Sequence, residues 1–178
     1  MKHAILILFF TLLTAQIVSA QYKVVPNMPY STLNASPGFI TINEVTYGLG
    51  LSGMSFPYSQ HFFGLTTVNG YQVNKNFIFA GGTGFYIYES GLLIPLFLDF
   101  RYCFHVNTFT PYLFADGGLL INPSLIDNTK LFINPGVGAR YTLSRKLAVN
   151  IGAGIHSQVD GTVRESFVNL KLGAVYKF

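Results

Sequence analysis

The sequence predicts an all-β fold, an eight-stranded antiparallel up-and-down transmembrane β-barrel, from three observations. Hydrophobic residues make up 50% of the chain and charged residues 10%, whereas an ordinary soluble domain has roughly 25% charged residues. Beyond residue 20, no apolar run reaches the roughly 20 residues that a membrane helix needs. The chain instead holds segments in which apolar residues alternate with polar or small ones, as in membrane-spanning β-strands. A closed barrel satisfies its backbone polar groups internally, which lipid requires.

The first twenty residues have the layout of a secretory signal peptide. Lys2 precedes an apolar run that ends at Leu13, and Val18-Ser19-Ala20 provides a small-residue cleavage site. The apolar run is too short to span a bilayer. We therefore expect a cleaved signal peptide at 1–20, an irregular periplasmic lead-in at 21–38, which could also fold back as a plug, and the barrel at 39–178.

Eight segments carry the alternating pattern, and each is expected to form one strand. They are 39–51, 61–73, 77–88, 94–104, 109–121, 130–143, 146–156 and 167–178. Polar and small residues share one face and branched aliphatic residues share the other, so we expect the first face to line the lumen and the second to contact lipid. A soluble lipocalin-type barrel would invert this arrangement. In 77–88 aromatic residues fall on both faces, so its lipid-facing side stays open.

The connections between these segments alternate between long and short. The long ones are 52–60, 89–93, 122–129 and 157–166. Outer-membrane barrels have long outer loops and short periplasmic turns, and an even number of strands places both termini in the periplasm. A soluble barrel has no reason to alternate its loop lengths.

The last twelve residues, "FVNLKLGAVYKF", place Tyr176 and Phe178 where an interfacial aromatic belt belongs. A final strand that ends in Phe resembles the β-signal read by the outer-membrane barrel-assembly machinery. The segments "TTVNGYQVNKNFIFAGGTGFYIY" and "IPLFLDFRYCF" resemble the small porin-like outer-membrane β-barrel domain family. The resemblance implies an eight-stranded barrel of the OmpA/OmpX type and supplies no catalytic motif. We expect a monomer in the bacterial outer membrane that contacts outer-membrane lipid, lipopolysaccharide and, during insertion, the assembly machinery.

Six charged residues fall on the predicted lumen face: Glu44, Asp99, Arg101, Asp116, Arg140 and Lys171. They could select ions or bind a polar ligand, or they could pair with one another, because an unpaired buried charge is costly. The lumen of an eight-stranded barrel is only wide enough for side chains, so pairing is favoured. From their depths along the strands we predict two clusters, Glu44 with Lys171, and Arg101 with Asp99 or Asp116.

Other candidate sites have simpler interpretations. His156 and Ser157 are neighbours on a strand and point to opposite faces, so we expect a loop-edge histidine and a solvated serine, with no catalytic pair. The single Cys103 excludes an internal disulfide, and His61 and His105 fall at opposite ends of the barrel, so no metal or cofactor is expected. The net charge of +4 is not clustered as nucleic-acid binding requires.

These observations rank three functions. The first is a structural or surface-interaction protein that acts through its outer loops. The second is a narrow pore or small-solute transport porin. The third, ranked lowest, is a lipid-modifying enzyme, and we predict that the protein is not an enzyme.

Overall fold

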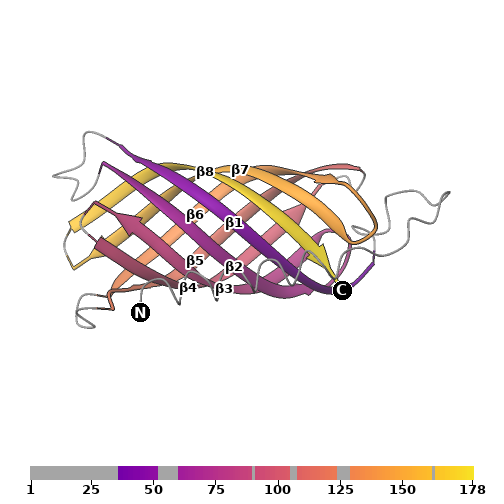
Figure 1. Ribbon diagram of the computed structural model, residues 1–178, viewed down its shortest axis with the longest axis horizontal. Helices are drawn as coiled ribbons and strands as arrows, with labels where there is room; N and C mark the ends of the chain where they lie inside the picture. Colours follow the sequence, from indigo (N-terminus) through magenta and orange to yellow (C-terminus); the bar gives the residue numbers. More distant parts are fainter. Residues whose placement is uncertain (1–35, 52–59, 90, 105–107, 124–128, 162) are drawn as a thin grey trace, which may run out of the picture.

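The chain forms a closed barrel in which eight antiparallel strands pair in sequence order and the last strand pairs with the first (Figure 1). The computed structural model describes residues 36–51, 60–89, 91–104, 108–123, 129–161 and 163–178. The strands are β1 (Gly38–Gly50), β2 (His61–Gln72), β3 (Phe77–Tyr88), β4 (Gly91–Cys103), β5 (Phe109–Ile121), β6 (Lys130–Thr142), β7 (Leu147–Asp160) and β8 (Val163–Lys177). This architecture confirms the predicted fold class. The described ranges contain no helix long and apolar enough to cross a membrane.

Two connections predicted to be long loops are mostly strand. The structure ends β3 at Tyr88 and begins β4 at Gly91, so the predicted loop 89–93 is wrong. It also extends β7 and β8 to Asp160 and Val163, so the predicted loop 157–166 is wrong as well. Gly91 and Gly161 have φ angles of 140° and 57°, which suit tight turns between adjacent strands.

The misleading feature was the polar composition of 157–166. In the structure these polar side chains bond across the β7–β8 pair: Ser157 and Ser166 hydroxyl oxygens lie 2.8 Å apart, and Gln158 Nε2 donates to Glu165 Oε2 at 2.5 Å. Cross-strand pairs of this kind stabilise a sheet. The other two predicted loops, 52–60 and 122–129, lie mostly outside the described residues, as do 1–20 and all of 21–38 before Ser36.

The lumen is packed from end to end with side chains of different character. Apolar residues such as Ile40 and Val175 fill the end where short turns join the strands, which we call the turn end. Aromatic rings fill the opposite end, which we call the loop end: Phe62 packs against Tyr86, Tyr88 and Phe167 with ring centroids 5.1–5.2 Å apart. Five charged residues, Glu44, Asp99, Arg101, Asp116 and Lys171, lie between these two apolar layers.

Glycines on the lumen face make room for these large side chains. A Cβ atom added at Gly82 would lie 2.3 Å from Phe97 Cζ, and one added at Gly48 would lie 2.0 Å from Phe62 Cε1. Small and bulky residues on the lumen face therefore complement each other across neighbouring strands. The alternation also resolves β3: Ile78 and Tyr86 point into the lumen, while Phe79 and Ile87 are exposed on the outside.

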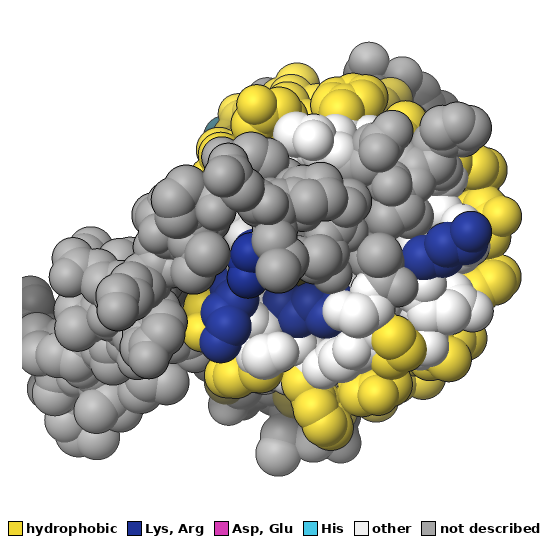
Figure 2. Space-filling model, turned by 90° about the vertical axis from the view of Figure 1, so that its right-hand side faces the viewer, with side chains coloured by type: hydrophobic (Ala, Val, Ile, Leu, Met, Phe, Trp, Pro, Cys, Tyr) yellow, Lys and Arg dark blue, Asp and Glu magenta, His cyan; other side chains and the backbone are white. Residues whose placement is uncertain are grey.

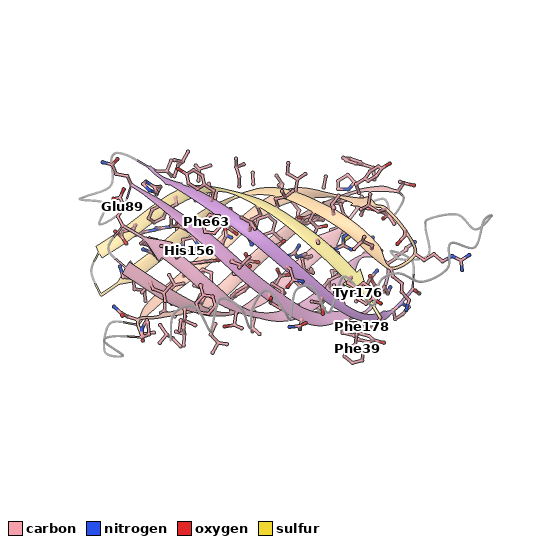
Figure 3. All side chains as sticks on the ribbon, in the orientation of Figure 1. Phe39, Phe63, Glu89, His156, Tyr176 and Phe178 are labelled. Carbon is pink, nitrogen blue, oxygen red and sulfur yellow. The ribbon has the colours of Figure 1, made fainter. Side chains whose placement is uncertain are left out.

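The outer wall is apolar, and aromatic residues gather on it near the turn end. Phe39 contacts Tyr71, and Tyr176 contacts Phe178, with ring centroids 5.0 and 5.1 Å apart. Figure 3 shows Phe39, Tyr176 and Phe178 together at this end, while Phe63 and Glu89 lie toward the other end. Such a girdle is typical of a membrane–water interface.

Candidate functional site: a charge network in the lumen

Two pairs of neighbouring strands, β1–β8 and β4–β5, bring five of the predicted charges to the middle of the lumen. Glu44 on β1 lies opposite Gly173 of β8, one diagonal step from Lys171. Asp99 on β4 lies directly opposite Asp116 on β5. Two carboxylates facing each other across strands repel, so this arrangement requires cations close by. Arg101, two residues after Asp99 on the same face, and Lys171 supply them.

The structure joins five of the six predicted charges into one network. Arg101 binds Asp99 through two nitrogens, Nε to Oδ1 at 2.9 Å and Nη2 to Oδ2 at 2.7 Å. Its third nitrogen, Nη1, lies 3.0 Å from Glu44 Oε1. Lys171 Nζ lies 3.4 Å from Glu44 Oε2 and also contacts Asp116 Oδ2. All five side chains are buried, with residue exposures of 1–4%.

The prediction of two separate clusters is therefore wrong, although Glu44 does pair with Lys171 and Arg101 with Asp99. Glu44 connects the two halves, because Arg101 reaches it across the lumen from β4. Asp116 binds Lys171, whereas the sequence analysis offered it as a partner of Arg101. Depth along a strand could not reveal this, because strand tilt and shear decide which distant strands face each other in a narrow barrel.

The sixth charge, Arg140, is also buried in the lumen, where its Nε donates to Asn150 Oδ1 at 3.2 Å. Sequence reasoning missed the two asparagines that extend the network. Asn134 Nδ2 donates to Asp116 Oδ2 at 3.0 Å, and Asn169 Nδ2 donates to Asn134 Oδ1 at 2.7 Å. Their positions among the lumen-facing residues of β6 and β8 could have indicated that they take part in the network.

Two further buried polar groups close the barrel ends. Glu165 accepts hydrogen bonds from Gln158 and from Lys130, whose Nζ lies 3.3 Å away. At the turn end, Lys177 Nζ contacts the Ser36 carbonyl oxygen and lies 3.4 Å from Gln72 Oε1. The sequence analysis missed Glu165 because it placed this residue in a loop.

The interpretation of His156 as a loop-edge residue and of Ser157 as a solvated one is wrong. His156 is fully buried inside the barrel, stacked on Phe132 at 4.9 Å between ring centroids (Figure 3). Ser157 is buried too and pairs with Ser166. The two residues do point to opposite faces, as their adjacency on one strand requires. No group of three metal-ligating side chains occurs within the described part of the chain.

Comparison with known proteins identifies the fold. Neisserial surface protein A superposes with a TM-score of 0.61 at 19% sequence identity, over 80% of this chain and 99% of that one. The outer membrane protein OprG from Pseudomonas aeruginosa superposes with a TM-score of 0.50 at 11% identity, over 82% of this chain and 98% of that one. This is the fold of small outer-membrane β-barrels. Neither a family model nor a curated protein sequence matches the chain.

This outer-membrane barrel fold contains several buried polar atoms in its lumen with no hydrogen-bond partner among the described residues. They are Thr46 Oγ1, Asp116 Oδ1, Asn150 Nδ2, His156 Nδ1 and Asn169 Oδ1. Buried polar atoms are rarely left unsatisfied, and ordered water molecules usually bind those without a protein partner. The charge network is therefore expected to hold individual water molecules between its side chains.

Proposed function

We propose that this protein is an integral protein of the bacterial outer membrane with a closed lumen, and that it acts through contacts at its surface. The observation that carries the proposal is the charge network, because it links β1, β4, β5 and β8 across the centre of the lumen. A solute would have to separate buried ion pairs to pass. Opening such a pair strands a desolvated charge, which is strongly unfavourable.

The short connections at the turn end support an orientation with that end in the periplasm, because outer-membrane barrels have their short turns there. Figure 2 views this end and shows lysine and arginine side chains, with no acidic group visible, inside a hydrophobic rim. Lys75, Arg145 and Lys146 lie on its turns. The acidic residues of the described chain lie either in the lumen or toward the loop end, as Glu89 and Glu165 do. The signal peptide predicted at 1–20 fits export to this location.

The loop end would then face outward and make the functional contacts. Predicted loops 52–60 and 122–129 are the longest connections there, and the β7–β8 hairpin adds exposed Arg164. His61 Nδ1 lies 3.2 Å from Glu89 Oε1 at the same rim. Cations and hydroxyl groups at this rim suit the phosphate groups of lipopolysaccharide, and the outer loops suit a host or neighbouring protein.

Planar-bilayer recording tests the closed lumen. The refolded wild-type protein is expected to insert without conductance steps. The double variant Tyr112→Ala with Phe114→Ala serves as a positive control, because both rings fill the lumen against the glycines of β6 and β7. Steps from the variant and none from wild type would support the proposal. Steady ion-conducting steps from wild type would overturn it.

A narrow pore is the second candidate, and the unsatisfied lumen atoms favour it. A chain of water molecules bound to Asn169, Asp116 and Asn150 would provide a polar path between the network and the turn end. Small steps in wild type that change with ionic strength, and that grow in Arg101→Ala, would support this function. A lipid-modifying enzyme has the least support, and mass spectrometry of lipid A from cells with and without the protein tests it.

A further inference from the structure

Among the described residues, polar side chains enter the apolar band of the outer wall on β1, β2 and β3. Thr41 and Asn43 on β1, Thr67 and Asn69 on β2, and Thr83 on β3 alternate with lumen residues and therefore lie on the outer face. Thr41 is buried there, and the other four side chains are partly or fully exposed. We call these five residues the polar patch. The register places them side by side: Thr41 pairs with Asn69, Asn43 with Thr67, and Thr67 with Thr83.

The polar patch begins beside the aromatic girdle, where Thr41 pairs with Tyr176, and extends from there into the apolar band. Along β2, Phe63 and Leu65 precede it and Tyr71 follows it, all on the outer face. On the described β4 to β8, outward positions from the turn end up to Ile155 and Val168 are apolar or glycine. A polar group facing lipid is costly and usually marks a functional contact. The patch is therefore expected to be covered by something other than lipid.

Hydrogen bonds within the patch leave donors available. Asn69 Oδ1 accepts from Thr41 Oγ1, and Asn43 Oδ1 accepts from Thr67 Oγ1, both at 2.7 Å. The Asn69 amide nitrogen and the Thr83 hydroxyl have no hydrogen-bond partner among the described residues, and both side chains are exposed. Lipid offers no hydrogen-bond partner to such groups, so a protein surface that covers the patch would satisfy them.

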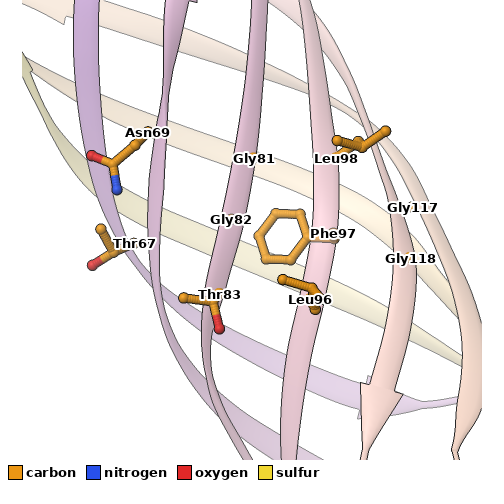
Figure 4. A pocket seen from close by; sticks show the side chains of 10 residues that line it. All are labelled: Thr67, Asn69, Gly81, Gly82, Thr83, Leu96, Phe97, Leu98, Gly117 and Gly118. Atoms are coloured by element: carbon orange, nitrogen blue, oxygen red, sulfur yellow. The ribbon is translucent and has the colours of Figure 1, made fainter.

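A depression of about 500 Å³ adjoins the polar patch, with a protruding side chain at its border (Figure 4). Gly81 pairs with Leu98, which pairs with Gly117, so one leucine stands between two glycines on the outer wall. Leu98 is 75% exposed. A Cβ added at Gly81 or Gly117 would meet no atom closer than 3.7 Å, unlike the lumen glycines Gly82 and Gly118. Packing inside the barrel therefore gives no reason for these two glycines.

Glycine in a strand can mark a place where another backbone approaches closely, and small residues with polar neighbours line the contacts between transmembrane helices. We propose that this surface is the interface of a homodimer in the membrane, in which Leu98 of each copy enters the depression beside Gly81 of the other. From the sequence we expected a monomer, and the proposed dimer differs from that expectation.

The surface is complementary to itself, which favours a second copy over an unrelated partner. It carries a projection and a matching hollow side by side, as a two-fold interface requires. Amide and hydroxyl groups both donate and accept hydrogen bonds, so Asn69 and Thr83 can pair with the same residues of a two-fold related copy. No charged side chain lies on it among the described residues.

Energy transfer between labelled copies in lipid vesicles tests the dimer. The mature chain carrying Lys75→Cys in an exposed turn is labelled with donor or acceptor and reconstituted in phosphatidylcholine–phosphatidylglycerol vesicles over a range of protein-to-lipid ratios. The native Cys103 is buried and stays unlabelled. Transfer above the level of random encounters, with a concentration dependence of a monomer–dimer equilibrium, is expected.

Two interface variants and one control variant, all in the same label background, decide the interface. Gly81→Phe fills the depression and is expected to weaken dimerisation at least tenfold, whereas Ala153→Phe, which adds a ring to the lipid-facing side of β7, should leave it unchanged. Asn69→Leu makes the wall more apolar and is also expected to weaken the dimer at least tenfold. Equal dimerisation of all three variants and wild type would overturn the proposal.

The inference rests on the proposed membrane location, and the two fail differently. A chain that does not insert into vesicles contradicts the location. A chain that inserts but transfers energy only at the random level contradicts the dimer alone. A photo-crosslinker at position 83 in native membranes should give an adduct of twice the chain's mass, and an adduct with another protein instead would also contradict the dimer.

Discussion

At the residue scale, the lumen network is stabilised by the pairing of each buried carboxylate with a cation. It contains three carboxylates, those of Glu44, Asp99 and Asp116, and two cations, Arg101 and Lys171. Lys171 is the only described cation in contact with Asp116, and it shares Glu44 with Arg101. Losing it would leave Asp116 buried without a positive partner.

Lys171→Met is therefore expected to lower the free energy of unfolding by about 3–5 kcal/mol, because removal of one partner leaves buried charge uncompensated. Urea unfolding in detergent, followed by the change in gel mobility, measures the effect. Lys75→Met, in an exposed turn, is the control and should change stability by less than about 0.5 kcal/mol. The double variant Lys171→Met with Asp116→Leu should recover much of the loss, and a single variant as stable as wild type would contradict the assignment.

Two adjacent glycines on β3 test which face of the strand is packed. A Cβ at Gly82 would lie within 2.3–2.8 Å of three Phe97 ring atoms, whereas one at Gly81 would lie 3.9 Å from its nearest neighbour. Gly82→Ala should cost about 1–3 kcal/mol through overpacking. Gly81→Ala should be neutral or stabilise by about 0.5–1 kcal/mol, because alanine loses less backbone entropy. Equal effects, measured by the same urea unfolding, would contradict the facing of β3.

At the element scale, the strands could be predicted because their signal is local. A period of two is visible within any ten residues, and it correctly separates lumen from lipid on β4 to β8. The ends of β7 and β8 could not be predicted, because Ser157, Gln158 and Glu165 become strand residues only through partners on the facing strand. The same limit applies to the network. Arg101 contacts Glu44 across the lumen, and the two residues are too far apart in sequence for a local pattern to predict this contact.

The end of β8 is predicted to act in assembly and to add little to the stability of the finished barrel. Phe178 is 70% exposed and is held mainly by the contact of its ring with Tyr176 and one backbone bond to Phe39. If the final strand is an assembly signal, deleting Phe178 should reduce folded protein in cells several-fold. Deleting Asp127, in a predicted outer loop, should not. The purified Phe178-deleted chain should still refold in detergent, and a refolding defect equal to the cellular one would show that Phe178 acts through stability.

At the scale of the whole molecule, stability comes from the closure of the sheet into a barrel and from its two surfaces, an apolar outer wall and a polar lumen. Each strand is hydrogen-bonded on both sides, since β8 completes the sheet against β1 over the register from Ile40–Lys177 to Gly50–Phe167. The apolar outer wall prefers lipid or detergent, and the lumen satisfies its own charges. Neither an open edge nor a single strand would be stable in lipid, so the barrel is expected to unfold as one unit.

This cooperativity predicts heat-modifiable migration in gels. The mature protein should remain with membranes until detergent is added, then migrate faster when loaded unheated in SDS than after boiling, because the closed barrel stays compact while its ladder is intact. A variant with Pro at position 170, which removes a backbone donor in the middle of β8, should migrate as the unfolded form under both conditions. Recovery of wild-type protein in the soluble periplasmic fraction, or identical migration before and after boiling, would contradict a membrane barrel. If wild type migrates as the compact form and the variant at position 170 does not, the compact form depends on the pairing of β8 with β1.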